Sequence, residues 1–223
     1  MNEVLFGIYP YIATTVFLLG SLFRYDREQY TWKANSSQLL SSKGLKWGSN
    51  LFHIGIIFLF FGHMLGLLTP HGLYHYFISA ENKQMVAMVS GGFFGMLCFI
   101  GMVILIHRRI TNLRIRVTTK FADWLVLLLL FVQLCLGLLT IPASAQHLDG
   151  SSMIALANWS QHIATFRPGA ASFILHEPLI FKLHIFVGLS MLLVFPFTRL
   201  VHVWSAPIKY VFRKGYQIVR KRG

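Results

Sequence analysis

The chain has 223 residues, of which 55% are hydrophobic and only 12% are charged. An ordinary soluble domain carries about 25% charged residues. The mean hydropathy of +0.60 is typical of an integral membrane protein. These values exclude a secreted disulfide scaffold, a disordered tail and a free soluble enzyme. The formal net charge of +13 can be interpreted only after the basic residues have been located along the chain.

Five apolar runs are long enough to cross a membrane, which takes about 20 residues. They predict transmembrane helices at about 4–23, 51–68, 85–106, 124–142 and 179–203. The first run is not a signal peptide, because no basic residue precedes it and no cleavage site follows it. The sequence thus predicts an all-α integral membrane protein, in which a bundle of five transmembrane helices forms a single domain over residues 1–223.

Basic residues alternate between the connections of the predicted helices. Most of the 20 Lys and Arg residues lie in three segments: 24–46, 107–122 and the tail 205–223. The other two connections, 69–84 and 143–178, hold only Lys83 and Arg167. By the positive-inside rule, the N-terminus lies outside and the C-terminus with its basic tail lies in the cytoplasm. Anionic lipid or a cytoplasmic partner explains this charge better than nucleic acid does.

The two cysteines, Cys98 and Cys135, each lie inside an apolar run and form no CxxC motif. Cysteine-ligated zinc, an iron–sulfur cluster and c-type haem attachment therefore lack ligands in this chain. We interpret both thiols as small buried hydrophobic groups.

Four of the ten histidines fall at membrane depth, where an ionisable side chain is costly and indicates a functional site. His53 and His63 lie on the second predicted helix, and His184 and His202 lie on the fifth. These helices run in opposite directions. We therefore expect His53 and His202 to lie at a similar depth near the inner side, and His63 and His184 at a similar depth near the outer side. At 1.5 Å per residue the pairs are about 21 Å apart. Pro196 can kink the fifth helix, on which His184 and His202 would share a face.

Two neutral imidazoles from opposite helices in an apolar pocket suit the axial positions of a b-type haem, so the two pairs predict two stacked haems. Glycines that let a flat macrocycle approach the backbone surround the histidines: Gly55, Gly62, Gly66 and Gly188. Arg109 and Arg199, at the inner boundary, can neutralise haem propionates. Hydrogen-bonded structural histidines and a proton path remain alternatives, whereas zinc is disfavoured because no carboxylate or cysteine lies near the four positions.

Short motifs are spread over nearly the whole chain: RYD at 24–26, YTW at 30–32, SNLFHIG at 49–55, GH at 62–63, TP at 69–70, LLTIP at 138–142, QH at 146–147 and FPFTRLVHVWS at 195–205. Together they resemble the gamma subunits of respiratory membrane-bound nitrate reductases, which are five-helix dihaem b cytochromes. The likeness is weakest across 151–177 and the last ten residues. It implies that His53 and His202 ligate the inner haem iron and that His63 and His184 ligate the outer one.

The resemblance also implies a quinol site beside the outer haem, near His63 and Gly66, with Lys83 as a contributor. The position of Lys83 alone favours a role as a side chain that anchors the helix at the lipid interface. The family role is to oxidise ubiquinol or menaquinol in the bacterial cytoplasmic membrane. Electrons then pass to a cytoplasmic iron–sulfur beta subunit and a molybdenum-containing alpha subunit, so this chain does not itself reduce nitrate.

Two other functions remain open from the sequence. The first keeps the two haems but changes the partner, because related dihaem subunits serve complexes of sulfur metabolism or heterodisulfide reduction. The second is a haem-free membrane transporter or scaffold, against which the chain shows no inverted repeat and no carboxylate at mid-membrane.

Overall fold

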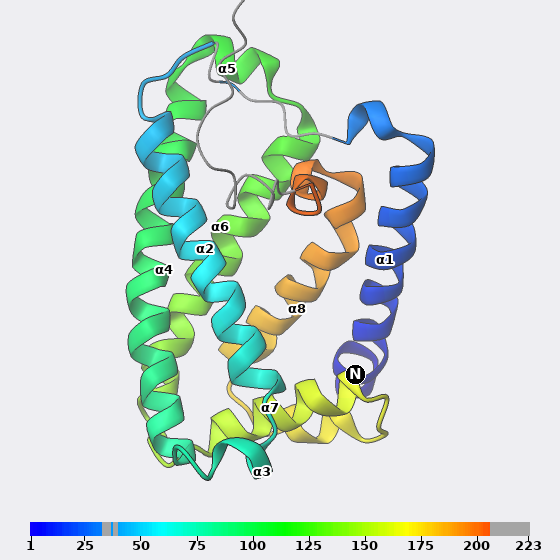
Figure 1. Cartoon of the computed structure of the whole chain (residues 1–223), viewed down its shortest axis with the longest axis vertical. Helices are drawn as coiled ribbons and strands as arrows, with labels where there is room; N and C mark the ends of the chain where they lie inside the picture. Colours follow the sequence, from blue (N-terminus) through cyan, green and yellow to red (C-terminus); the bar gives the residue numbers. More distant parts are fainter. Residues whose placement is uncertain (33–36, 38–39, 206–223) are drawn as a thin grey trace, which may run out of the picture.

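A computed structural model describes residues 1–32, 37 and 40–205 (Figure 1). Across these residues the chain is all-helical, with no β-strand. Five stretches are long and apolar enough to cross a membrane: Val4–Arg27, Leu45–Leu68, Ala80–Thr111, Phe121–Ser144 and Leu179–Phe197. The predicted fold class, an all-α membrane protein with five spans, is confirmed. Apart from Ser205, the predicted basic tail lies outside the described residues.

The membrane-crossing elements are η1 (Val4–Ile8) with α1 (Tyr9–Arg27), α2 (Leu45–Leu68), α4 (Ala80–Thr111), α6 (Phe121–Ser144) and α8 (Leu179–Val194). Short elements connect them or follow them: η2 (Gln29–Thr31), α3 (His71–Tyr74), α5 (Leu113–Thr118), α7 (Ser151–Ala164), η3 (Ala170–Ile174), η4 (Phe195–Phe197) and η5 (Arg199–Val203). Several spans extend beyond their predicted ends because polar residues at the interface continue the helices. The connection 143–178, in which no helix was predicted, contains α7 and η3.

The five long helices pack in the spatial order α2, α4, α6, α8 and α1, whereas α2 and α8 scarcely touch each other (Figure 1). Glycines allow the closest of these approaches, between α2 and α4. A Cβ on Gly55 would lie 2.6 Å from the carbonyl oxygen of Phe94, and one on Gly101 would collide with the amide nitrogen of Phe52. Because α2 and α8 are held apart by the helices between them, each can present side chains to the other across the bundle.

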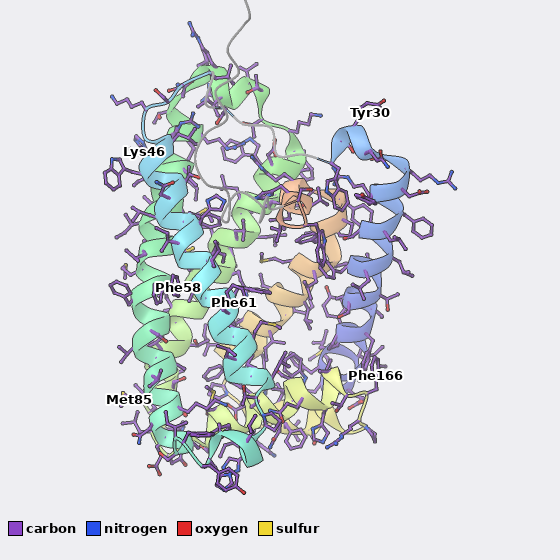
Figure 2. The ribbon with its side chains drawn as sticks, in the orientation of Figure 1. Tyr30, Lys46, Phe58, Phe61, Met85 and Phe166 are labelled. Atoms are coloured by element: carbon purple, nitrogen blue, oxygen red, sulfur yellow. The ribbon has the colours of Figure 1, made fainter. Side chains whose placement is uncertain are left out.

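Large apolar side chains project outward around the bundle (Figure 2). The labelled examples Phe58 and Phe61 on α2 and Met85 on α4 are all exposed. In water such a surface would be strongly unfavourable, but lipid tails solvate it. The exposed apolar surface therefore agrees with the length and composition of the five spans in assigning the chain to a membrane.

The fifth span is shorter than the predicted helix 179–203. The α-helix ends at Val194, and the chain continues through η4 and η5, with Thr198 between them in extended conformation (φ −126°, ψ 179°). Proline at position 196 cannot donate a backbone N–H and its ring clashes with the preceding turn of an α-helix. The expectation that His184 and His202 share a face of one continuous helix is therefore wrong, since His202 lies on a 3₁₀ turn.

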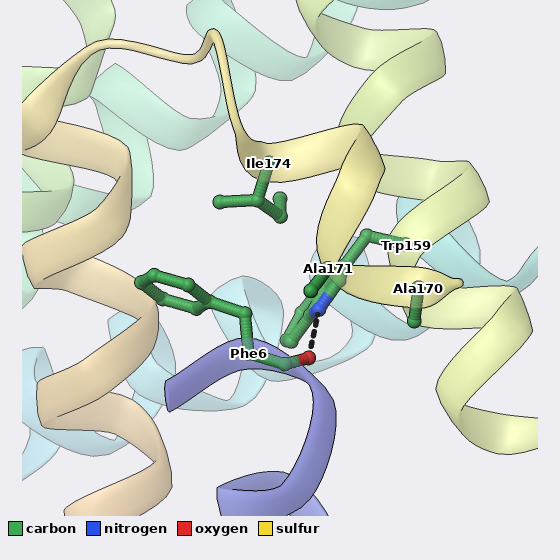
Figure 3. Close-up of a cluster of buried hydrophobic side chains, with 5 residues drawn as sticks. All are labelled: Phe6, Trp159, Ala170, Ala171 and Ile174. Atoms are coloured by element: carbon green, nitrogen blue, oxygen red, sulfur yellow. Dashed lines mark hydrogen bonds between the residues drawn. The ribbon is translucent and has the colours of Figure 1, made fainter. Parts of the chain in front are cut away.

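The end of the bundle formed by α3 and α7 is closed by a buried cluster (Figure 3): Phe6, Trp159, Ala170, Ala171 and Ile174. The indole Nε1–H of Trp159 donates a hydrogen bond of 2.9 Å to the carbonyl oxygen of Phe6. Pro10 stands where the α-helical donor to that carbonyl would be, and proline has no N–H. The indole therefore satisfies a carbonyl of η1, just before α1, and attaches α7 to this end of the first span.

Candidate functional site

The four membrane-depth histidines lie in two pairs. The ring centroids of His53 and His202 are 6.5 Å apart, with ring planes at 74°. Those of His63 and His184 are 6.0 Å apart, with ring planes at 35°. In each pair α2 contributes one ring, and α8 or the turn after it contributes the other. Because α2 and α8 run in opposite directions (Figure 1), the two pairs lie at different depths of the bundle.

The separation within each pair fits a single metal ion between the two rings. An imidazole nitrogen lies about 2 Å from the first-row metal that it ligates. Each ring centre lies about 1 Å behind that nitrogen, so two imidazoles on opposite sides of one iron have centroids about 6 to 6.5 Å apart. The observed 6.0 and 6.5 Å match this value.

Backbone carbonyls set the tautomer of three of the four rings. Nδ1 lies close to the carbonyl oxygen of a residue one turn earlier in each case: His53 with Ser49 (2.7 Å), His63 with Leu59 (2.7 Å) and His202 with Arg199 (2.6 Å). A carbonyl only accepts hydrogen bonds, so the proton is on Nδ1 and the lone pair is on Nε2. In metal sites, the ring nitrogen that does not bind the metal commonly donates a hydrogen bond of this kind, which fixes the orientation of the ring.

The fourth ring, His184, has a different environment, which is built by α6. Its Nε2 lies 3.4 Å from the side-chain Nε2 of Gln133, and its buried Nδ1 has no hydrogen-bond partner among the described residues. A Cβ on Gly137 would lie 3.0 Å from the ring, so only glycine leaves room for it there. Neither α6 residue was predicted from the sequence, although Gln133 is a rare polar side chain inside the fourth span.

The ligand sets also suit a macrocycle. Among the described residues, no group of three or more His, Cys, Asp or Glu side chains could hold a metal ion. Two histidines per site are sufficient only for a metal that brings its other ligands with it, as haem iron does. The residues present therefore fit a haem between the members of each pair.

Two of the four glycines predicted to flank a macrocycle have other neighbours. Gly55 packs against α4, and a Cβ on Gly188 would lie 3.0 Å from the amide nitrogen of Gln133. A Cβ on Gly62 would meet nothing within 4 Å, and one on Gly66 would meet only the methyl group of Met153, at 3.7 Å. The prediction that Gly55 flanks a macrocycle is therefore corrected, because its small size allows α2 to pack closely on α4.

Two arginines lie beside the pair formed by His53 and His202. The guanidinium of Arg109 donates a hydrogen bond of 3.0 Å to the hydroxyl of Thr119, and that of Arg199 lies 3.6 Å from the carboxylate of Asp123. Arg109 also interacts electrostatically with Arg199 and Asp123. Two cations with one carboxylate leave a local positive charge next to His202, whose Nδ1 binds the Arg199 carbonyl.

Lys83, the candidate quinol residue, lies near the start of α4. Its Nζ is 3.6 Å from the ring centroid of Tyr74, which is a cation–π contact. The same Nζ is buried and has no hydrogen-bond partner among the described residues. Burial raises the pKa of the Tyr74 hydroxyl, so this phenol stays protonated at neutral pH. Lys83 thus has unused N–H donors in apolar surroundings.

Paired histidines facing each other across antiparallel membrane helices define a class, the b-type cytochromes of membranes. Within that class the chain belongs to the nitrate reductase gamma subunit family, whose family model matches residues 2–222. It is 52% identical to the respiratory nitrate reductase 1 gamma chain of Escherichia coli (strain K12) over 222 residues, which are 100% of this chain and 98% of that relative. The resemblance found in the sequence is confirmed.

Two further relatives have the same extent. Identity to the respiratory nitrate reductase 2 gamma chain of the same organism is 51% over 222 residues, again 100% of this chain and 98% of the relative. Identity to the nitrate reductase gamma chain of Bacillus subtilis (strain 168) is 39% over 225 residues, 99% of each chain. Because the matches run the full length, all five spans and both histidine pairs fall within them.

Proposed function

We propose that this chain is the membrane subunit of a respiratory nitrate reductase, which oxidises quinol in the bacterial cytoplasmic membrane and delivers the electrons to partner subunits. The observation that carries the proposal is the pair of histidine sites at 6.0 and 6.5 Å in a chain of this family. The family match favours nitrate reductase over complexes of sulfur metabolism or heterodisulfide reduction. It also weighs against a haem-free transporter or scaffold.

In this proposal His53 and His202 would hold the inner haem iron, and His63 and His184 would hold the outer one. The carbonyl bonds to Nδ1 leave Nε2 as the ligating atom in three of the four rings. When bound, the two b haems supply one-electron transfer across the bundle. Arg109 and Arg199 supply positive charge for the inner haem propionates.

The orientation follows from the basic connections, with the N-terminus outside and the C-terminus in the cytoplasm. The end formed by α5 and η5 then faces the cytoplasm, and the end formed by α3 and α7 faces outward. An iron–sulfur beta subunit and a molybdenum-containing alpha subunit dock on the cytoplasmic end. Nitrate is reduced in the alpha subunit, to which this chain supplies electrons.

The quinol site lies at the outer end, beside His63. Lys83 donates a hydrogen bond from Nζ to a quinol oxygen, a role that its buried and unpartnered amine allows. Gly66 leaves space for the quinol ring next to α2, since a Cβ there would make only an ordinary contact. Oxidation of one quinol releases two protons on the outer side and sends two electrons inward. Each inward transfer costs roughly 2.3 kcal/mol per 100 mV of membrane potential.

An optical spectrum of the purified complex, oxidised and then reduced with dithionite, tests the cofactor assignment. We expect two low-spin b-type haems per chain. A folded, colourless protein from cells that make haem would contradict the proposal and favour a transporter or scaffold.

A Lys83→Ala substitution tests the quinol site. We expect quinol oxidation to fall roughly 10- to 100-fold, the value of a hydrogen bond from a charged donor, with unchanged haem spectra. The control is Lys182→Ala, because Lys182 also lies at the outer end but donates to the carbonyl of Leu175 at 2.8 Å. Equal rates in the two variants would remove Lys83 from the site.

A further inference from the structure

The chain changes conformation between the two histidines of the fifth span. After α8 ends at Val194, Pro196 lies in η4 and Thr198 is extended before η5 begins. The last carbonyl groups of a helix have no intrahelical donors, and the proline removes one more N–H from this stretch. Where the α-helical pattern is interrupted in this way at the edge of a membrane, carbonyl groups of the irregular stretch need donors from elsewhere in the protein.

Arg24, at the end of α1, supplies those donors. Its Nη1 donates to the carbonyl oxygens of Pro196 (2.6 Å) and Thr198 (2.8 Å), and its Nη2 donates to that of Thr31 (3.0 Å). One half-buried guanidinium thus connects the chain just after α1 with the chain just after α8. The planar, always charged guanidinium holds several acceptors in fixed directions, which a lysine ammonium does not.

Other contacts between the same two segments lie before and after His202. The ring of Phe17 on α1 packs edge-on against Phe195 at 4.8 Å and stacks on Trp204 at 5.5 Å. The indole of Trp32 donates a hydrogen bond of 2.6 Å to the hydroxyl of Ser205. Figure 1 shows that the end of α1 and the turns after α8 lie at the same end of the bundle. Both flanks of the His202 turn are therefore attached to α1.

The orientation of the His202 ring depends on this attachment. Its Nδ1 binds the carbonyl oxygen of Arg199, the residue directly after Thr198. The carbonyl of Thr198 is one of the groups held by Arg24. In contrast, His53 and His63 bind carbonyls within the regular helix α2, which needs no such support.

We propose that Arg24 is a positioning residue for the inner haem ligand, fixing the turn that carries His202 through the carbonyls of Pro196 and Thr198. The inference rests on the proposed function, in which His53 and His202 ligate the inner haem. Arg24 touches neither haem nor quinol in this role. Its removal should change the inner site and leave the outer site, on α2 and α8, unaltered.

The test compares Arg24→Gln and Arg24→Lys with the wild-type complex in membranes. The matched control is Arg27→Gln, because Arg27 follows by one turn on α1, its side chain is 81% exposed and it pairs with neighbouring Asp26 at 3.2 Å. Haem content, the two midpoint potentials and the low-spin electron paramagnetic resonance signals are measured for each. For Arg24→Gln we expect roughly a 10- to 100-fold loss of inner-haem affinity, or a shifted inner potential and signal, with the outer haem unchanged.

Arg24→Lys keeps the charge but offers no planar fork, so we expect a smaller shift of the same inner signal. Hydrogen exchange in the haem-free full-length chain gives a second reading: the amides of Thr198 and Trp204 should exchange faster in Arg24→Gln than in Arg27→Gln. This reading does not depend on a bound cofactor.

If the wild type holds two haems and the inner signals are unaltered in both Arg24 variants, the role of Arg24 is overturned but the proposed function is not. Equal changes at both haems would also overturn it, since that pattern means general destabilisation. If Arg24→Gln fails to accumulate in the membrane, Arg24→Lys decides by the same criteria. A wild-type complex without two haems would overturn the proposed function, and the inference with it.

Discussion

The His63–His184 and His53–His202 pairs, which are the outer and inner pairs in the proposed orientation, have similar ring separations but different structural support. In the outer pair, His63 and His184 both lie within regular α-helices, α2 and α8. In the inner pair, His53 lies on α2, whereas His202 lies on a 3₁₀ turn after α8 has ended. The rings of His53 and His63 bond to carbonyls of α2 itself, and that of His184 on α8 contacts Gln133 and Gly137 of α6. The turn that carries His202 depends on contacts with α1, a segment that is distant in the sequence.

The two ends of the bundle are stabilised in correspondingly different ways. The outer end is closed by the apolar cluster around Phe6 and Trp159, with the indole bond to the Phe6 carbonyl (Figure 3). At the inner end, polar bonds from Arg24 and a group of aromatic rings attach α1 to the turn that carries His202. We therefore expect changes in the cluster around Phe6 and Trp159 to act mainly through stability, and changes at Arg24 and the neighbouring rings to act mainly through ligand geometry.

The largest effects should come from the ligands themselves. His202→Ala should remove the inner haem and His184→Ala the outer one, each leaving the other haem in place and lowering electron delivery to nitrate by more than ~100-fold. Haem quantification and spectra of the two variants check this. Loss of both haems in either variant would mean that the two sites are not independent, and the comparison between them would fail.

A smaller but still large effect is expected from Trp159→Ala at the outer end. Truncating a buried tryptophan leaves a cavity and an unpaired carbonyl, so we expect a loss of about 3–5 kcal/mol in stability. Thermal unfolding in detergent measures it. The control is Phe166→Ala, since Phe166 is 80% exposed, and it should change stability far less. Haem potentials in the surviving Trp159→Ala protein should be the same as in the wild type.

The smallest of these effects concerns the contact of α1 with η4, the turn that precedes the one carrying His202. A Cβ at Gly20 would lie 2.9 Å from Cγ of Pro196, so Gly20→Ala pushes against η4 at a cost of about 1–3 kcal/mol. We expect a shifted inner-haem signal. The control is Gly91→Ala on α4, where a Cβ meets nothing within 4 Å, and alanine should there stabilise by up to ~1 kcal/mol. Identical spectra for the two variants would show that α1 does not influence the inner site.

Much of this protein was determined by its sequence alone. The five apolar runs determine the number of spans, because the thickness of the hydrocarbon core sets a minimum helix length. The alternation of helix direction then determines which histidines lie at equal depth. The pairing of His53 with His202 and of His63 with His184 follows from that local information.

Only the tertiary structure decided how those rings are held. The end of α8 at Val194, the contact of Gly55 with α4 and the position of Gln133 beside His184 depend on which helices approach closely. Such contacts join residues far apart in the chain, and neither hydrophobic periodicity nor spacing encodes them. The bond from Arg24 to the chain after α8 is of this kind, because a carbonyl in an irregular stretch has no helical donor and can be satisfied by any segment that folds against it.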